Sequence, residues 1–389
     1  MQSYNSLWQI IPGTIKRFPG KENIKGSANM SKLLKFLCLI AIFMVSVPLE
    51  SHAANSSYQL FVNDKKFEGQ YQPIVRNNAI YVPMWGVLSE LGISPEWDEK
   101  YRTFRVNTSS GVVFFKTNSP MIIRTELNVN NFDGGDTSQS SDKRFGREVL
   151  RLNYYPIAVN DVVYVPLVFM TNYLNLNVVW GENNDIQISG GNFSVEQNLK
   201  NLYKAWNDKF GKTGNSYSNY WYAYNYEGFR SKYFNTAFMY FPQQLANYSE
   251  LAEYFNQDLW VYKPSDLFTD VGLPNLTKVK ITYIGDGAIL VNDGNYDYTV
   301  PISPLAEDSI SGFLTDNPYK AYNWTQKAWD AIRAEKIMIG MNQDMVVMSW
   351  GYPKRTNSYE GLYGTYSQWV YDSDTYVYFE DGILSSIQY

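Results

Sequence analysis

The sequence contains one histidine, His52, and one cysteine, Cys38. Both lie in a segment that we expect to be removed on export, which would leave the mature chain with neither residue. Without them the chain cannot form a Ser-His or Cys-His nucleophile pair, a disulfide bond, or a zinc or copper site of the ordinary ligand type. These absences favour a protein that binds or holds a partner over an enzyme, and they predict no metal and no cofactor.

Residues 30–53 are predicted to be a signal peptide. The segment begins with two lysines, its run 36–49 is almost wholly apolar, and a Ser-His-Ala sequence ends it with small residues where signal peptidase requires them. We expect cleavage between Ala53 and Ala54. The mature protein would then be secreted and extracellular, and association with the cell wall is left open.

The alternative for this segment is a membrane anchor. Its apolar run is shorter than the roughly 20 residues that cross a bilayer, and it contains Pro48. Cleavage is therefore favoured, and no membrane span is predicted for the mature chain. Residues 1–29 do not fit a signal peptide, and we expect them to be an upstream extension before a start at Met30.

After cleavage the chain would contain fewer basic than acidic residues. Residues 1–53 hold six of the 33 Lys and Arg residues and two of the 38 Asp and Glu residues, so the mature chain would carry 27 basic and 36 acidic residues, a net charge of −9. An acidic secreted protein is a poor candidate for binding nucleic acid. The expected partner is a cell-wall polymer or a secreted or surface protein.

An internal repeat is the most specific pattern in the chain. Residues 73–83 (PIVRNNAIYVP) align without a gap on residues 156–166 (PIAVNDVVYVP), an offset of 83 positions. The Asn-Asn and Asn-Asp pairs suit a tight hairpin turn, and the proline of Tyr-Val-Pro suits the first turn of a helix. Each copy, about 58–107 and 145–190, is predicted to fold as β-hairpin, helix and β-hairpin.

These residues resemble the copper amine oxidase N-terminal domain, a stalk-like module of secreted bacterial proteins. The resemblance covers residues 55–190 and rests on YVPM with LGISPEW and on YVPL with LNLNVVW. It implies a non-catalytic module. Trp85 and Val168 stand where the family usually has arginine. The copper and modified tyrosine of the oxidase belong to a different domain, and this chain lacks the histidines of such a site.

Residues 194–256 are predicted to be a helical, aromatic-rich region. Ser194 and Gln197 form a capping-box pattern, and apolar residues then follow at helical spacing, which predicts a helix over 195–210. Beyond it, tyrosines occupy every second position, so a strand there would place all of them on one face. Exposed, the row would bind sugar rings or a protein; buried, which is favoured, it would be core. The candidate binding residues are Tyr220, Tyr222, Tyr224 and Tyr226.

Residues 257–303 are predicted to form a small β-barrel-like unit. Strands over 279–283, 288–291 and 296–302 are separated by glycine- and asparagine-containing turns. Three strands bury little surface by themselves. We therefore expect the segment 260–262 to complete the unit.

Residues 318–389 are predicted to be an α+β sandwich. Helices over 324–336 and 343–350 precede an antiparallel meander, so the helices would cover one face of the sheet. The order and spacing resemble the BamE/OmlA-like fold of small envelope proteins that act as assembly factors or scaffolds. The matching positions are Gly340, Met341, Asn342, Val346, Gly351, Pro353, Trp369, Tyr371, Phe379, Asp381 and Gly382.

Together these segments predict an α+β multidomain protein with a tandem repeat domain, a small helical and barrel-like middle, and a C-terminal two-helix and meander sandwich. The favoured function is a secreted, non-catalytic envelope protein that serves binding, spacing or assembly. One alternative is a glycoside hydrolase or carbohydrate-binding protein, with Asp293 and Asp297 or Glu380 and Asp381 as carboxylate pairs. These carboxylates lie in predicted turns, which weakens the hydrolase reading. A self-assembling surface-layer protein is the other alternative.

Overall fold

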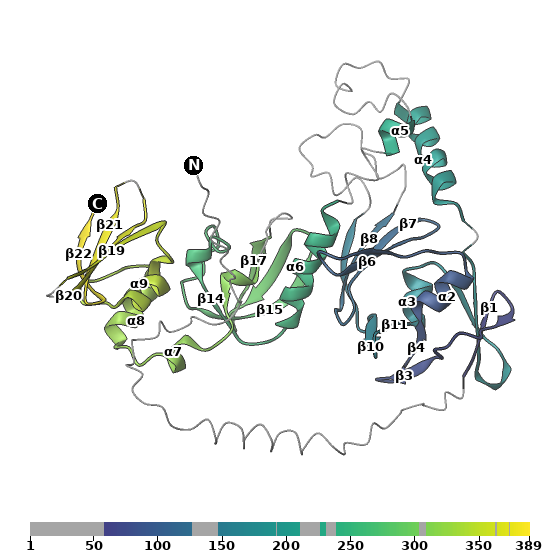
Figure 1. The fold of residues 1–389 in the computed structure, drawn as a ribbon, viewed down its shortest axis with the longest axis horizontal. Coiled ribbons are helices and arrows are strands. Elements are labelled where there is room, and N and C mark those ends of the chain that lie inside the picture. The colour runs from purple at the N-terminus through teal and green to yellow at the C-terminus, as the bar shows by residue number, and fades with distance from the viewer. Residues whose placement is uncertain are drawn as a thin grey trace, which may run out of the picture. The chain divides into compact units, whose positions relative to one another are not determined.

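The computed structural model describes residues 58–126, 147–191, 193–210, 226–230, 239–302, 309–361, 364–372 and 374–389. These residues form a mixed α/β structure in which five sheets alternate with short helices (Figure 1). The predicted signal peptide, its cleavage site at Ala53 and Ala54, and the predicted tyrosines up to position 224 lie outside the described residues.

Two hairpins of the N-terminal region join into one four-stranded sheet in the order β10-β11-β4-β3. The strands are β3 (Ile74–Arg76), β4 (Ala79–Pro83), β10 (Ile157–Val159) and β11 (Val162–Pro166). All four residues of the predicted Asn-Asn and Asn-Asp turn pairs have positive φ, from 49° to 63°. The two turn predictions are confirmed, because these side chains reach the left-handed conformation at low steric cost.

A short helix follows each of these hairpins directly after its proline. They are α2 (Met84–Glu90), after Pro83, and α3 (Leu167–Asn172), after Pro166. Gly92 follows α2 with φ 70°, the left-handed conformation in which glycine commonly ends a helix. The apolar faces of both helices pack into a core shared by the strands of the N-terminal region.

The second hairpins of the two copies enter different sheets. In the first copy, β5 (Glu96–Asp98) and β6 (Thr103–Asn107) belong to a five-stranded sheet, β5-β6-β7-β8-β9. In the second copy, β12 (Asn177–Trp180) and β13 (Asp185–Ser189) are separated by a short 3-10 turn, Glu182–Asn184. They join β1 (Gln59–Val62) and β2 (Lys65–Lys66), with β1 parallel to β13. This pairing brings the two ends of the N-terminal region together.

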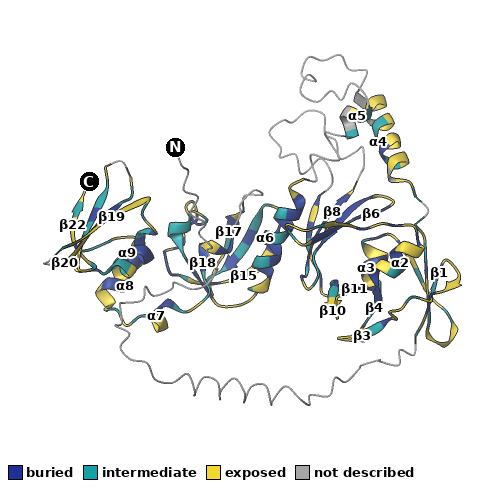
Figure 2. Ribbon diagram, viewed as in Figure 1, coloured by how far each residue is buried: buried dark blue, intermediate teal, exposed yellow. Residues whose placement is uncertain are grey.

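The central strands of the five-stranded sheet are largely buried on both faces. It includes β7 (Gly111–Phe115), β8 (Met121–Glu126) and β9 (Glu148–Arg151), which the repeat pattern does not predict. Alternate residues of β7 contribute to two different cores: Val113 and Phe115 to the N-terminal core, and Val112 and Phe114 to the core of the middle region. The central strands are accordingly dark blue in Figure 2. A continuous apolar run is what a strand covered on both sides requires.

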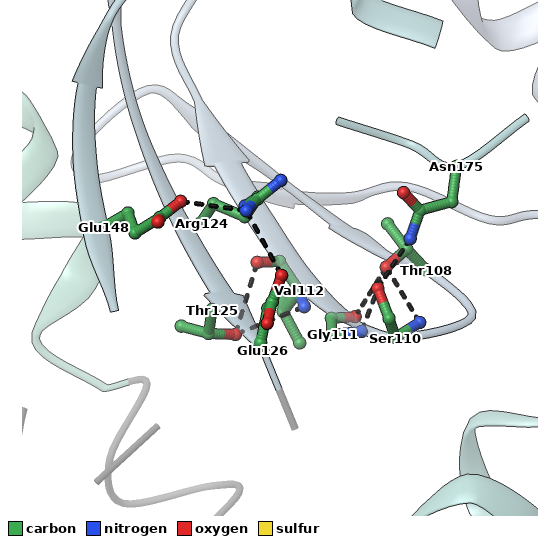
Figure 3. A network of polar contacts seen from close by, with 9 residues as sticks. All are labelled: Thr108, Ser110, Gly111, Val112, Arg124, Thr125, Glu126, Glu148 and Asn175. Carbon is green, nitrogen blue, oxygen red and sulfur yellow. Dashed lines mark hydrogen bonds and ion pairs between the residues drawn. The ribbon is translucent and has the colours of Figure 1, made fainter. Parts of the chain in front are cut away.

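A polar network closes one end of this sheet (Figure 3). Arg124 makes ion pairs with Glu126 at 3.2 Å and with Glu148 at 3.0 Å. The Thr125 hydroxyl bonds the backbone of Val112 on the neighbouring strand. A Cβ atom at Gly111 would lie 1.8 Å from the Thr125 carbonyl oxygen, so this close approach requires glycine.

The middle region consists of helix α6 (Phe241–Glu253) and an open five-stranded sheet, β17-β16-β15-β14-β18. Its strands are β14 (Leu259–Val261), β15 (Lys278–Gly285), β16 (Ala288–Asn292), β17 (Asp297–Pro301) and β18 (Phe313–Leu314). The four predicted strands are present. The expected barrel is not closed in the described residues, because β17 and β18 form opposite edges of the sheet.

Polar side chains join the N-terminal sheet to the middle region. The fully buried Arg147 donates to the Gln244 side chain at 2.7 Å and forms an ion pair with Asp286. Ser119 donates to Ser249 on α6 at 2.8 Å. Since α6 also packs against β7 and β8 in one apolar core, these contacts tie the two regions into a continuous structure.

The predicted helix over 195–210 is confirmed as α4 (Val195–Phe210). The Ser194 hydroxyl accepts a hydrogen bond from the Gln197 backbone N–H at 3.1 Å, as an N-cap residue does. A short helix, α5 (Tyr226–Phe229), contacts α4 through an edge-on pair of rings, Tyr203 and Tyr226.

The C-terminal region contains three helices and a four-stranded antiparallel meander. The helices are α7 (Pro318–Ala321), α8 (Gln326–Arg333) and α9 (Gln343–Trp350). The sheet runs in the order β19-β20-β21-β22, with β19 (Arg355–Gly361), β20 (Gly364–Val370), β21 (Tyr376–Glu380) and β22 (Ile383–Gln388). Asn342 caps α9 by accepting from the Met345 N–H at 2.9 Å, as predicted.

A buried asparagine holds this region to the middle region. Asn275 is 0% exposed, and its amide donates to the last-turn carbonyls of α8 and α9, at Ile332 (3.3 Å) and Met348 (2.9 Å). Its carbonyl oxygen accepts from the Lys263 N–H at 3.2 Å, at the start of the 3-10 turn Lys263–Ser265. One side chain therefore makes hydrogen bonds to three backbone groups that are buried away from water and would otherwise be unpaired.

Two half-buried tyrosines lie at the same junction. The Tyr262 hydroxyl donates to the Val347 carbonyl at 3.0 Å, and the Tyr371 hydroxyl donates to the Gly351 carbonyl at 2.8 Å. Burial raises the pKa of both phenols well above the ordinary value, and Tyr352 and Tyr262, respectively, add to the effect. Both tyrosines are therefore neutral in the folded protein well into the alkaline range.

Among the residues described, no helix is both long and apolar enough to span a bilayer.

Candidate functional site

The C-terminal sheet has one covered and one uncovered face. Trp369, Val377, Phe379 and Leu384 point inward and pack with the apolar side chains of α8 and α9. The intervening residues of the same strands point the other way, because side chains alternate along a strand. No described helix packs on that outer face, which carries tyrosines and side-chain amides in place of an apolar core.

Hydrogen bonds link the outer-face side chains across all four strands. The Asn357 amide on β19 donates to the Gln368 side-chain oxygen on β20 at 2.8 Å. The Gln368 amide donates to the Tyr378 hydroxyl on β21 at 3.0 Å, and that hydroxyl donates to the Gln388 side-chain oxygen on β22 at 2.8 Å. We call these four residues the amide relay. The relay holds polar groups in fixed positions on a surface where side chains are ordinarily free to rotate.

Two tyrosines stand beside the relay. Tyr359 and Tyr366 are direct cross-strand partners on β19 and β20, and they are 69% and 44% exposed. Each lies two residues along its strand from a relay residue, so both rings share the outer face. A pair of exposed rings next to fixed amides is a surface suited to binding.

A shallow cavity of about 520 Å³ lies over this face, which is within the size range of small-ligand sites. Its lining is mostly uncharged, and Glu380 is its one charged member. The lining residues are Asn357, Ser358, Tyr359, Tyr366, Ser367, Gln368, Tyr378, Phe379, Glu380, Ser385 and Ser386.

The sequence-predicted tyrosine row does not coincide with this site. Tyr220, Tyr222 and Tyr224 lie outside the described residues. Tyr226 begins helix α5, so the conditional argument from a strand does not apply at that position. Burial raises the pKa of Tyr226 to about 12, and Glu196 adds to the shift. Tyr226 is therefore a partly buried packing residue of the α4 and α5 pair.

Sequence reasoning missed the outer face because it missed β19. That strand reads RTNSYEG and carries no aliphatic residue, so no apolar alternation marks it as a strand. A sequence pattern typical of a strand was nonetheless present, because polar and aromatic residues recur at every second position. Asn357 and Tyr359, then Tyr366 and Gln368, repeat at a spacing of two on either side of the turn.

The first candidate carboxylate pair, Asp293 and Asp297, has structural partners. In the β16–β17 turn, Asp293 accepts from the backbone N–H groups of Asn295 and Tyr296 at 2.8 Å, and these bonds hold its pKa below the usual value. Asp297 accepts from the Asn292 amide at 2.8 Å. A general acid of a glycosidase needs a raised pKa, so the arrangement at Asp293 is the opposite of the one required.

The second proposed pair is divided between two roles. Asp381 accepts from the Thr365 N–H at 2.9 Å and has φ 48°, as a hairpin-turn residue does. Glu380 lines the outer-face cavity without a second carboxylate in the lining. Two facing carboxylates are the minimum that glycoside hydrolysis ordinarily uses.

A smaller cavity of about 300 Å³ lies where β5 and β6 face the start of α6. Arg105 makes an ion pair with Glu96 there at 3.4 Å, and burial lowers the pKa of the guanidinium. Asp98 accepts from the Tyr101 N–H at 2.9 Å, which closes a turn. The charged groups of this cavity are thus engaged with each other or with the backbone.

The position at which the resemblance expects arginine is exposed. Trp85 is 46% and Val168 41% exposed, each just inside a helix after its proline. The Trp85 ring meets Phe104 edge-on at 6.0 Å between ring centroids. The residue in the first copy therefore packs partly on the domain surface.

These observations define a mixed α/β protein in which a hairpin-and-helix N-terminal region precedes two further sheets, the last with an uncovered polar and aromatic face. Residues 61–189 match the family model of the copper amine oxidase N-terminal domain, which confirms the resemblance for that part of the chain. A search of curated proteins found no significant match. Within the described ranges, no group of three or more His, Cys, Asp or Glu side chains is placed to hold a metal ion.

Proposed function

We propose that this protein is a secreted, non-catalytic protein of the cell envelope that holds a cell-wall polymer or a surface protein on the outer face of its C-terminal sheet. The observation that carries the proposal is the amide relay, with Tyr359 and Tyr366 beside it. Folding orders these side chains without covering them. Groups that are already ordered lose less conformational entropy when they bind.

In this proposal the N-terminal region is a spacer. Its match to the copper amine oxidase N-terminal domain supports a non-catalytic, stalk-like role. The repeat in register further supports a tandem duplication, since each copy supplies one hairpin to the shared sheet β10-β11-β4-β3. The contacts of Arg147 and Ser119 hold the N-terminal region to the middle region. The N-terminal region would therefore keep a fixed distance from the proposed binding face.

The C-terminal region would act as a scaffold of the BamE/OmlA-like kind. The order of two helices followed by a meander, the Asn342 cap and the Asp381-Gly382 turn are consistent with that resemblance. A scaffold role needs no reactive group. The engaged carboxylates of the β16–β17 and β21–β22 turns favour this role over hydrolysis.

Retention on isolated cell wall tests the proposal. The mature chain from Ala54 is mixed with wall fractions, and the Tyr359→Ala, Tyr366→Ala double variant should be retained several-fold less. Tyr352→Ala is the matched control, since this tyrosine of the same region is 70% exposed and does not line the cavity. Equal retention of the double variant and the wild type would contradict the proposal.

Self-assembly is a second candidate, favoured by the edge strand β19. Among the residues that the structure describes, it pairs only with β20, whereas β22 at the opposite edge bonds Gly340 and Met341. A seven-residue strand with an open edge can pair with another copy. Sedimentation velocity decides between the two: a binding protein stays a discrete species as concentration rises, and an assembling layer protein does not.

A further inference from the structure

We infer that the outer face of the C-terminal sheet takes a neutral polysaccharide chain. This inference rests on the proposed function, because it names the chemical class of ligand for the same face. It is carried by the juxtaposition of two exposed tyrosine rings with the amide relay, in a shallow cavity whose lining contains a single charge.

The tyrosine pair supplies flat apolar area. Tyr359 and Tyr366 lie side by side on adjacent strands, which are about 4.8 Å apart. Both rings are substantially exposed. A pyranose ring presents a face of C–H groups that packs on an aromatic ring, so two neighbouring rings provide contacts for an extended sugar chain.

The amide relay retains hydrogen-bonding capacity for such a chain. A side-chain amide has two N–H donors and an oxygen that accepts two bonds. Within the relay, Asn357 and Gln368 each use one N–H group, and Gln368 accepts one bond. The relay therefore keeps both N–H donors and amide oxygen acceptors for a ligand. Sugar hydroxyls both donate and accept, so a surface that offers both kinds of group fits them.

The charge of the face favours a neutral ligand. Glu380 is the one charged residue of the cavity lining. Arg355 lies on the same side of β19, two residues before Asn357, and is not part of the lining. An anionic polymer such as a polyuronate or polyphosphate would meet a carboxylate with no lysine or arginine in the lining to neutralise it.

A protein partner fits the face less well. The energy of a protein interface is concentrated in a few large side chains inserted into desolvated pockets. This cavity is shallow, and its lining includes the hydrogen-bonded side chains of Gln368 and Tyr378, which a partner would have to desolvate. A sugar that stacks flat on a tyrosine ring makes its polar contacts through the hydroxyls at its rim. The Gln368 and Tyr378 side chains can then stay hydrogen-bonded.

Binding of defined sugars tests the inference. Isothermal titration of the mature chain with cellohexaose and chitohexaose, and with polygalacturonate as the anionic comparison, measures each Kd. We expect binding of at least one neutral hexasaccharide and none of polygalacturonate. Tyr359→Ala and Tyr366→Ala should each weaken that binding about tenfold. Tyr352→Ala should bind like the wild type, and all variants should share its melting temperature.

Retention on cell wall separates failure of this inference from failure of the proposed function. If the double variant loses retention on whole wall but neutral sugars do not bind, or if polygalacturonate binds, the ligand class is wrong and the binding face stands. If the double variant binds whole wall normally and fails only to capture a protein from the secreted fraction, the ligand is a protein and the inference is likewise overturned. If retention and protein capture are both unchanged, the binding face itself is wrong.

Discussion

The Gln368 side-chain amide donates a hydrogen bond to the Tyr378 hydroxyl on the neighbouring strand, 3.0 Å away. Gln368 also accepts a bond from Asn357, so its amide is held from both sides on an uncovered surface. This geometry fixes the middle of the amide relay before any ligand arrives. Order of this kind is unusual for polar side chains on an exposed sheet face, and it is the basis of the proposed binding role.

Replacing Tyr378 by phenylalanine tests the relay directly. Tyr378→Phe keeps the ring and removes the hydroxyl that joins Gln368 to Gln388. We expect weaker ligand retention and a loss of about 1 kcal/mol in the free energy of unfolding. Retention assays and urea denaturation measure the two effects. Tyr352→Phe, at a 70% exposed position of the same region, is the control, and equal effects of both substitutions would count against the relay.

Asn275 is predicted to be essential for attachment of the C-terminal helices. Asn275→Ala would leave the Ile332 and Met348 carbonyls and the Lys263 N–H without their partner. Since each buried polar group left unpaired costs about 1–3 kcal/mol, we expect at least that loss in the free energy of unfolding. Asn295→Ala, at an exposed turn, should change stability little. Similar denaturation midpoints for the two variants would show that Asn275 carries no such role.

Arg147 is predicted to hold the N-terminal sheet to the middle region. Arg147→Ala would leave Asp286 and Gln244 without their shared cation, and breaking a buried pair of this kind costs about 3–5 kcal/mol. We expect the lower half of that range, because Asp286 is 34% exposed and water screens it. Differential scanning calorimetry measures the change. Arg76→Ala, on the exposed strand β3, provides the comparison, and a null result at Arg147 would remove the proposed link.

Alkaline pH is predicted to loosen the junction of the middle and C-terminal regions. The folded pKa values of Tyr262 and Tyr371 are raised, so the unfolded chain loses these protons first. Their contribution to stability is thus complete below about pH 10 and is lost as pH rises through the folded pKa values. The slope is on the order of 1.4 kcal/mol per pH unit for each fully titrating group.

Thermal unfolding followed by circular dichroism at pH 9, 10.5 and 11 measures this loss. Tyr262→Phe should lower stability at pH 9, because the Val347 carbonyl loses its donor, and should flatten the decline above pH 10. Tyr296→Phe, at an exposed position, should leave the stability at pH 9 unchanged. An identical alkaline decline in Tyr262→Phe and the wild type would contradict the assignment.

Much of the local structure could be predicted from residues whose conformational preferences are strong. The asparagine turns, the prolines before α2 and α3, the Ser194 and Asn342 caps and the helix over 195–210 depend on neighbouring residues alone. These features follow from steric and hydrogen-bonding preferences that act within a few positions.

The remaining features depend on contacts between distant segments. Strand β7 was missed because its apolar run serves two cores, which no single-face pattern describes. The middle sheet was expected to close because a local pattern does not reveal that α6 and the N-terminal sheet cover its apolar face. The outer face proposed to bind a ligand was not predicted, because β19 owes its strand conformation to pairing with β20 and not to apolar periodicity.

Chemical labelling of tyrosines measures whether glycan covers the outer face of the C-terminal sheet. The mature chain is nitrated with tetranitromethane in the presence and absence of cell-wall glycan, and the modified positions are identified by mass spectrometry. We expect glycan to protect Tyr359 and Tyr366, while Tyr296 and Tyr352, which are as exposed as Tyr359, react as before. Unchanged nitration of Tyr359 and Tyr366 on saturated glycan would contradict it.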